Sequence, residues 1–407
     1  MPSSAPNSSD LRPPSATRSS GPEPEPAAEA LEAPSKRALA RHFGLFLATA
    51  ASMVITYASM DEGGFADRAS WRHGGIFAAS LLLILLSHEL GHYIAARIHK
   101  VDATLPFFIP MPFLSPFGTM GAVIRMRGTI RTRRALLDIG ASGPLAGLVF
   151  AIPLYVWGIR HSQVVPESVT QGGTFGESLL TRGLDALFGP HLADGTVLVA
   201  SPVLFAAWAG LFVTMLNLLP IGQLDGGHVA YALIGPKQDR AAVIIHRSLL
   251  AFFFVSLGSY LARDIAAGQG FYHLGARVND SLFWLVWFEI LGVLGALTRN
   301  ASPERSRLDG DEDADTVGSR TRIIAVVALS ILASVGREHP LPSLWAAWFV
   351  GLAVLLAMEI RGGTLRPHNL FDHPRVESEG LGPVRKVVAV VALAFFALLF
   401  MPTPISL

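Results

Sequence analysis

Cysteine is absent from the chain of 407 residues, and charged residues make up only 15% of it. Without cysteine there can be no disulfide, no cysteine-ligated zinc and no thiol catalysis, so a metal must use histidine or oxygen ligands. Average soluble domains carry about 25% charged residues, whereas here 51% of the residues are hydrophobic. The net charge of +1 gives no argument for nucleic acid as a partner. The composition therefore predicts a multi-pass membrane protein in a lipid bilayer.

Nine apolar segments approach or exceed the length of about 20 residues that a helix needs to span a bilayer. They are 43–60, 75–97, 136–158, 200–219, 241–262, 281–297, 322–336, 343–360 and 386–401. The seventh segment is short and could form half of a helical hairpin with the eighth. We predict an all-α polytopic membrane protein with about nine transmembrane helices.

Arginine and lysine are concentrated in alternate connections between these segments. The basic stretches are 36–41, 97–134, 299–322 and 361–386, while the other connections carry few such residues. Because basic loops face the cytoplasm, we expect these stretches on the cytoplasmic side and loop 159–199 on the opposite side. The expected location is the bacterial cytoplasmic membrane.

The sequence His88-Glu89-Leu90-Gly91-His92 lies inside the second apolar segment. Histidines four residues apart fall on one face of a helix and can bind one metal ion. A glutamate between them can deprotonate a metal-bound water. Ionisable side chains are costly at membrane depth, which indicates a functional role. In the orientation above, the motif lies in the half of its helix nearer the cytoplasm.

A catalytic zinc site of this type needs a third protein ligand. Asp225 and His228 are the candidates, and both follow the fourth apolar segment, whose helix Pro220 and Gly222 should end. Spacing alone leaves the choice between them open. His99, His246, His368 and His373 have no obvious ligand spacing and are expected to be interfacial or loop residues. For Asp138, helix capping and a role toward substrate are both considered.

These motifs resemble the site-2 protease family of intramembrane zinc metalloproteases over about residues 75–232. His88–His92 is similar to the first motif of the family, and Asn217-Leu-Leu-Pro with Leu224-Asp225-Gly226 is similar to the second. Gly140–Gly147 resembles a stretch of the intervening helix, and Gly118–Ile124 resembles a region that forms a membrane-associated β-hairpin near the active site. Neither a PDZ nor a CBS domain, which many relatives carry, is recognisable here.

The resemblance implies one Zn²⁺ per chain, held by His88, His92 and Asp225, with Glu89 as the general base. It implies cleavage of single-pass membrane proteins, such as membrane-tethered regulators, within or near the transmembrane segment. It also implies that Asn217 holds the substrate or the oxyanion.

The stretch around Gly118, Gly121 and Val123 could pair with an extended substrate, because its glycines permit close backbone approach and Val123 favours a strand. A plain loop with an apolar patch is the alternative.

Two other functions are considered. An ion or metal transporter would also place His, Glu and Asp within the membrane, but it predicts paired broken helices, and the sequence shows one break. An inactive scaffold with the protease fold would not need Glu89.

The domain organisation follows from these assignments. Residues 1–38 are rich in Pro, Ser, Ala and Glu, show no signal-peptide pattern and are expected to be a disordered tail. The protease core is placed at 39–235, additional transmembrane helices at 236–300 and C-terminal transmembrane helices at 322–407. The cytoplasmic linker 301–321 lacks the glycine and the final glutamate of a calcium loop, since Ala314 and Arg320 occupy those positions.

Overall fold

The computed structural model describes residues 35–126, 128–169, 174–300, 314–338, 341–362 and 379–406, together with positions 365, 371, 373, 376 and 377. The helices are α1 (Lys36–Met60), α2 (Arg68–Ile98), α3 (Arg133–Arg160), α4 (Leu179–Phe188), α5 (Pro202–Asn217), α6 (Asp225–Ile234), α7 (Lys237–Ala266), α8 (Leu274–Asn300), α10 (Ala314–Glu338), α11 (Pro342–Gly362) and α12 (Pro383–Leu399). Most of the predicted tail and linker, residues 1–34 and 301–313, lies outside the described residues.

Six of the described helices are long and apolar enough to cross a membrane, namely α1, α2, α3, α7, α8 and α11. The multi-pass class is therefore confirmed, whereas the predicted number of nine spans is not. The three remaining predicted segments also form helices, but α5 has 16 residues and α12 has 17. The first part of α10 is polar and contains Arg320 and Arg322, which leaves a shorter apolar stretch.

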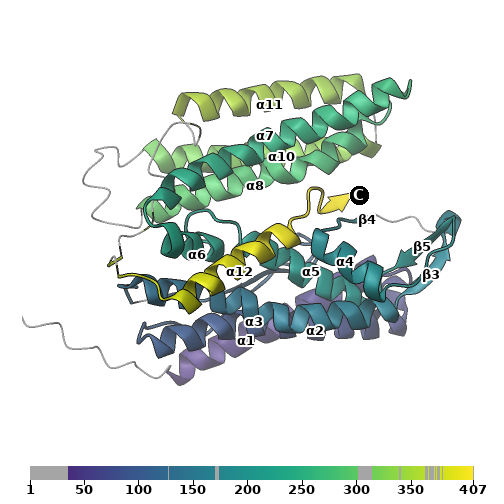
Figure 1. Ribbon diagram of the computed structural model, residues 1–407. Helices are drawn as coiled ribbons and strands as arrows, with labels where there is room; N and C mark the ends of the chain where they lie inside the picture. The colour runs from purple at the N-terminus through teal and green to yellow at the C-terminus, as the bar shows by residue number, and fades with distance from the viewer. Residues whose placement is uncertain are drawn as a thin grey trace, which may run out of the picture. The chain divides into compact units, whose positions relative to one another are not determined.

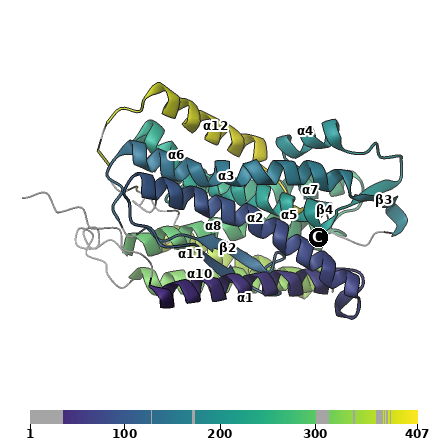
Figure 2. The same cartoon turned by 90° about the horizontal axis from the view of Figure 1, so that it is seen from below.

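The helices α2, α3 and α5 pack against one another, with α1 beside α2 (Figures 1 and 2). Glycines allow the close approach of α2 to α3. A Cβ atom added at Gly91 of α2 would lie 2.5 Å from the carbonyl oxygen of Ser142 on α3. Small residues at such contacts are typical of helix packing in membranes. This contact lies inside the His88–His92 motif, so it places α3 directly beside the histidines.

Among the described residues, three short antiparallel strand pairs accompany the helices. They are β1 (Phe107–Pro110) with β2 (Thr119–Val123), β3 (Gln163–Pro166) with β5 (Thr196–Val199), and β4 (Thr174–Phe175) with β6 (Ile405–Ser406). The all-α prediction anticipated only a hairpin near the active site. The β3–β5 and β4–β6 pairs are therefore a correction to it, and they form from loop 159–199 and the C-terminal residues.

The β1–β2 pair packs against α1. The hydroxyl of Ser52 donates a hydrogen bond to the carbonyl of Gly118 at 2.6 Å, and His42 Nδ1 lies 3.0 Å from the carbonyl oxygen of Pro106. Gly118 has a positive φ of 69°, and an added Cβ there would lie 2.6 Å from the Cα of Met53. Only glycine fits this position. Association of the pair with the membrane stays a prediction.

The C-terminal helices α7, α8, α10 and α11 pack in sequence order, α7 on α8, α8 on α10 and α10 on α11 (Figure 1). The helix α12 instead returns to the first group and packs on α3, α5 and α6. An ion pair fixes its start, because Arg385 donates to both carboxylate oxygens of Asp138 at 2.7 to 3.1 Å. The β4–β6 pairing holds the chain beyond its other end.

Candidate metal centre and active site

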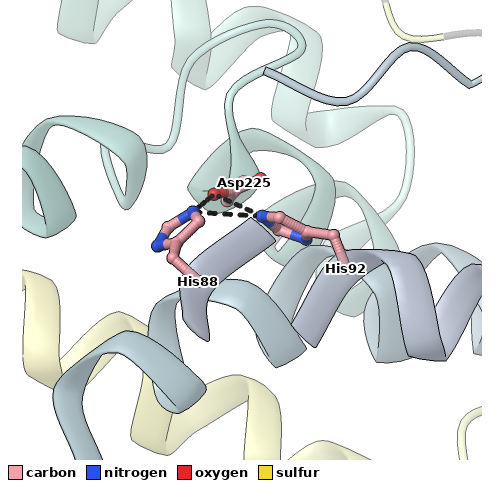
Figure 3. A group of neighbouring side chains, drawn as sticks. All are labelled: His88, His92 and Asp225. Carbon is pink, nitrogen blue, oxygen red and sulfur yellow. Dashed lines mark hydrogen bonds and ion pairs between the residues drawn. The ribbon is translucent and has the colours of Figure 1, made fainter. Parts of the chain in front are cut away.

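Three side chains converge on one point between α2 and the start of α6 (Figure 3). The Nε2 atoms of His88 and His92 are 3.1 Å apart, and Asp225 Oδ2 lies 3.1 Å from the first and 3.2 Å from the second. Within the described part of the chain, this is the one group of three such residues whose ligand atoms lie close enough to share a metal ion. All three side chains are largely buried, with exposed fractions of 5%, 7% and 16%.

The histidines are placed by a long helix and oriented by its neighbour. The helix α2 runs without interruption for 31 residues, so His88 and His92 are one turn apart on the same face. His92 Nδ1 lies 2.7 Å from the carbonyl oxygen of Ile139 on α3 and must donate to it, because a carbonyl can only accept. The other ring nitrogen, Nε2, then keeps its lone pair for a metal ion, as is usual in metal sites.

The third ligand is placed by the break between α5 and α6. The chain turns after Asn217, with Gly222 at a positive φ of 52°, and α6 begins at Asp225. The far end of α6 is fixed by Arg133, which donates to the carbonyls of Ala232 and Leu233 at 2.9 and 3.0 Å. A cation at a helix C-terminus satisfies its last carbonyls and complements the helix dipole.

Glu89 and Asn217 lie beside the three ligands. Glu89 is 6% exposed, and its carboxylate accepts a hydrogen bond from the backbone amide of Ile124, just beyond β2. The side-chain amide of Asn217, at the end of α5, lies 3.3 Å from Nε2 of His88. The structure thus brings the four residues predicted as ligands and base together with the residue predicted to hold substrate.

A cavity of about 670 Å³ opens onto these side chains. One wall is the stretch 122–126, which includes the last two residues of β2, and another is the stretch 221–225. A further wall could not be expected from the sequence. It comes from α8 and from the segment before α12 and consists of Leu291, Leu294, Gly295, Phe371, His373 and Val376.

The three residues predicted to contact substrate along β2 occupy different positions. Val123 lines the cavity, is 52% exposed and stands opposite Phe107 of β1. Gly121 precedes the cavity wall with a φ of 103° and has no atom within 4 Å of an added Cβ. Gly118 is buried against α1 and does not line the cavity. Its position gives it a packing role instead of the predicted substrate contact.

His228, the rival third ligand, lines the cavity but stands outside the ligand group. Its Nδ1 lies 2.6 Å from Nε2 of His373, and the ring of His373 stacks on Tyr231 with centroids 4.4 Å apart. The structure therefore places Asp225, and not His228, with the two motif histidines.

Among the other ionisable residues singled out from the sequence, Asp138, His99 and His246 have structural partners. Asp138 pairs with Arg385 and with His99, whose Nε2 lies 2.8 Å from its Oδ2. The capping interpretation of Asp138 is wrong, because Thr132 caps α3. His246 donates from Nε2 to the carbonyl of Phe288 at 2.8 Å. His368 lies outside the described residues.

Residues 76–256 match the family model described as Peptidase family M50. The chain is 35% identical over 205 residues to a probable zinc metalloprotease, EGY2, chloroplastic, of Oryza sativa subsp. indica. The aligned part covers 46% of this chain and 36% of that protein. It is 33% identical over 196 residues to the Arabidopsis thaliana protein of the same name, 44% of this chain and 34% of that one. A third relative, the probable zinc metalloprotease EGY1 of Arabidopsis thaliana, is 32% identical over 167 residues, 39% and 29% of the two chains.

The resemblance to the site-2 protease family is confirmed. The chain spans about a third of the length of the curated relatives it matches. No solved structure matches the chain.

The residues present fit the zinc ion that this resemblance implies. Two imidazole nitrogens and one carboxylate oxygen are a common protein donor set for catalytic zinc, which uses three protein ligands and leaves a position for water. The ligand atoms already lie within 4.8 Å of one another. The hydrogen bond from His92 to Ile139 supplies the orienting partner that such ligands usually have.

Proposed function

We propose that the protein is an intramembrane zinc metalloendopeptidase that cleaves membrane-spanning proteins within or near their transmembrane segment. The observation that carries this proposal is the placement of Glu89 beside the cluster of His88, His92 and Asp225, in the lining of a cavity that β2 borders. The match to Peptidase family M50 supports it over the same residues.

In this proposal each side chain has one role. His88, His92 and Asp225 would hold zinc, which when bound lowers the pKa of its water and polarises the scissile carbonyl. Glu89 takes the proton of the attacking water and later delivers it to the leaving nitrogen. Its hydrogen bond with the Ile124 amide keeps the carboxylate directed toward the cavity. Asn217, beside His88, holds the carbonyl oxygen of the substrate.

A substrate helix must unwind before its amide bonds can be attacked, because they are hydrogen-bonded within the helix. The strand β2 pairs with β1 on one side, and residues 122–126 face the cavity on the other. We propose that an extended substrate segment pairs with this edge near Gly121 and Val123. Main-chain hydrogen bonds would stabilise it with little demand on its sequence.

We propose that the active site faces the cytoplasmic side of its membrane. The arginine and lysine distribution supports this side for the carboxyl end of α2. The bacterial cytoplasmic membrane stays the prediction from the sequence, whereas the relatives named above are described as chloroplastic. The proposed substrates are single-pass proteins such as membrane-tethered regulators.

The proposed division of the chain assigns 39–235 to the protease core and 236–300 and 322–407 to accompanying helices. Because α8 and positions 371, 373 and 376 border the catalytic cavity, these parts of the chain would limit access to the site as well as stabilise the fold.

The decisive experiment compares membrane proteomes of cells that express the parent protein, Glu89→Gln or Glu62→Gln. Glutamine is nearly isosteric with glutamate but cannot accept the proton. Glu62 is exposed and lies in the turn between α1 and α2, before the first residue of the helix that carries the motif. Fragments of single-pass proteins should appear with the parent and with Glu62→Gln, and disappear with Glu89→Gln.

All three proteins should contain equal zinc, which would show that Glu89→Gln leaves the ligand site folded. The same fragments in all three samples would overturn the proposal. A transporter predicts instead that Glu89→Gln alters ion uptake and leaves the fragment pattern unchanged.

A further inference from the structure

A second buried carboxylate lies far in sequence from the metal centre. Glu289 is in the middle of α8, within its apolar, membrane-spanning part, and is only 2% exposed. Neither of its carboxylate oxygens has a hydrogen-bond partner among the described residues. A carboxylate so placed has lost its contact with water and has gained no replacement donor.

Two other charged residues lie close to Glu289, one on α10 and one on α11. Arg322 of α10 and Glu359 of α11 form an ion pair with Nε and Oε1 3.0 Å apart, and their side chains are 9% and 0% exposed. Arg322 attracts the charge of Glu289, whereas Glu359 repels it. Because the guanidinium already pairs with Glu359, its attraction does not compensate the charge of Glu289.

The two other elements packed on α8, the helix α7 and the strand β6, add no compensating charge. From α7, His246 donates to the carbonyl of Phe288, and Arg247 donates to the carbonyl of Leu365 at 3.0 Å. Within the described part of the chain, neither of them forms an ion pair or hydrogen bond with Glu289. The strand β6, which also touches α8, contains no titratable side chain.

An isolated ionised carboxylate is strongly disfavoured in such surroundings. Burying a charge without a paired, hydrogen-bonded partner is energetically unfavourable, and a group in that position becomes neutral instead. Ionisable residues at membrane depth often mark proton or ion sites for this reason. One proton on Glu289 would remove the charge.

We propose that Glu289, together with the Arg322–Glu359 pair, forms a buried proton-binding site in the C-terminal helices, occupied by a proton at neutral pH. The same helix, α8, carries the site and contributes Leu291, Leu294 and Gly295 to the wall of the catalytic cavity. Release of the proton would therefore destabilise the packing of a helix that borders the active site.

Infrared spectroscopy of the purified protein in lipid nanodiscs tests directly whether Glu289 carries a proton. A protonated carboxylic acid has a carbonyl-stretch band that a carboxylate lacks, so the parent should show an acid band at neutral pH. The band should be lost in Glu289→Gln and retained in Glu62→Gln, which changes an exposed carboxylate. Glu89→Gln identifies any contribution from the buried glutamate of the metal centre. A neutral-pH spectrum with no acid band that depends on Glu289 would overturn the proposal.

Thermal unfolding gives a second, independent readout. The folded protein holds the proton on Glu289, whereas the unfolded chain releases it to water. The stabilisation is therefore present at low pH and is lost as the pH rises through the range in which the folded protein releases this proton. The parent should become less stable with rising pH relative to Glu289→Gln, which mimics the neutral acid. Glu289→Met, an apolar residue of similar length, should behave in the same way and replaces glutamine if that variant folds poorly.

The same measurement distinguishes a proton from a metal cation. If sodium chloride stabilises the parent more than an equal concentration of choline chloride, and Glu289→Gln abolishes the difference, then the occupant is a sodium ion and the proposal is wrong. Equal stability of the parent in both salts, together with the pH dependence, supports the proton. This outcome does not depend on proteolytic activity, so it can fail or succeed independently of the proposed peptidase function.

Discussion

A methyl group at position 143 should abolish tight zinc binding without unfolding the protein. Gly143 of α3 faces the ring of His92, and a Cβ added there would lie 2.5 Å from the ring Cδ2 and closer still to Nε2. Real Cβ atoms essentially never come within 3.0 Å of another heavy atom, so the ring must withdraw by at least about half an ångström. Functional zinc–ligand distances tolerate about 0.2 Å.

The displacement therefore exceeds the tolerance of the site. Loss of an orienting partner alone typically reduces metal affinity by about 10–100-fold, and Gly143→Ala should reduce zinc affinity by at least this much because it moves a ligand. Alanine favours a helix over glycine by roughly 1 kcal/mol, so the substitution should leave α3 helical.

Two glycines provide graded controls. An added Cβ at Gly147, one turn further along α3, would lie 3.5 Å from His88 Cβ and Nδ1, which is ordinary van der Waals contact. Gly75 of α2 has no atom within 4 Å of an added Cβ. Chelator competition on the purified proteins should rank zinc affinity as Gly75→Ala equal to parent, Gly147→Ala near it and Gly143→Ala far below it. Parent-like affinity in Gly143→Ala would refute this reasoning.

Four further predictions concern the ligand set, the strand edge, the topology and α12. Asp225→Ala should lose zinc and activity while His228→Ala keeps zinc, as measured by metal analysis; the reverse result would make His228 the ligand. Val123→Pro should cut cleavage sharply and retain zinc, with Val123→Ala as the control; unchanged cleavage would contradict strand pairing. Single cysteines introduced into 159–199 should react only with label applied from the side opposite the cytoplasm. Arg385→Gln should lower the free energy of unfolding by about 1 kcal/mol, since its ion pair is partly exposed.

The parts of the site that depend on local geometry could be predicted from the sequence. His88 and His92 share a helix face because of their spacing. The position of Glu89 beside the metal ligands could be predicted for the same reason, since it lies between them on this helix. The choice of Asp225 over His228 could not be made in this way, since both follow the same helix break. It depends on how the turn after Asn217 directs the start of α6, which is a tertiary property.

The residues that form the apolar walls of the cavity show no recognisable pattern in the sequence. Leu291 and Leu294 resemble any other residue of an apolar helix, and Phe371 and His373 lie in a connection without a motif. Hydropathy also measures composition and not helix length. The apolar run 200–219 therefore suggested a full span, whereas the chain leaves the helix at Asn217 to form the turn that presents Asp225.

The helix α3 sets the geometry of the metal centre although it contributes no ligand. The ligands His92 and Asp225 are 133 residues apart in the sequence, so some third element must fix their distance. On one side, α3 accepts the hydrogen bond of His92 at Ile139 and approaches the ring through Gly143. On the other, Gly140 lies against α6, where an added Cβ would be 3.3 Å from the carbonyl oxygen of Asp225. Because larger side chains at these glycines would push α2 and α6 apart, the small residues of α3 constrain the site as strictly as the ligands themselves.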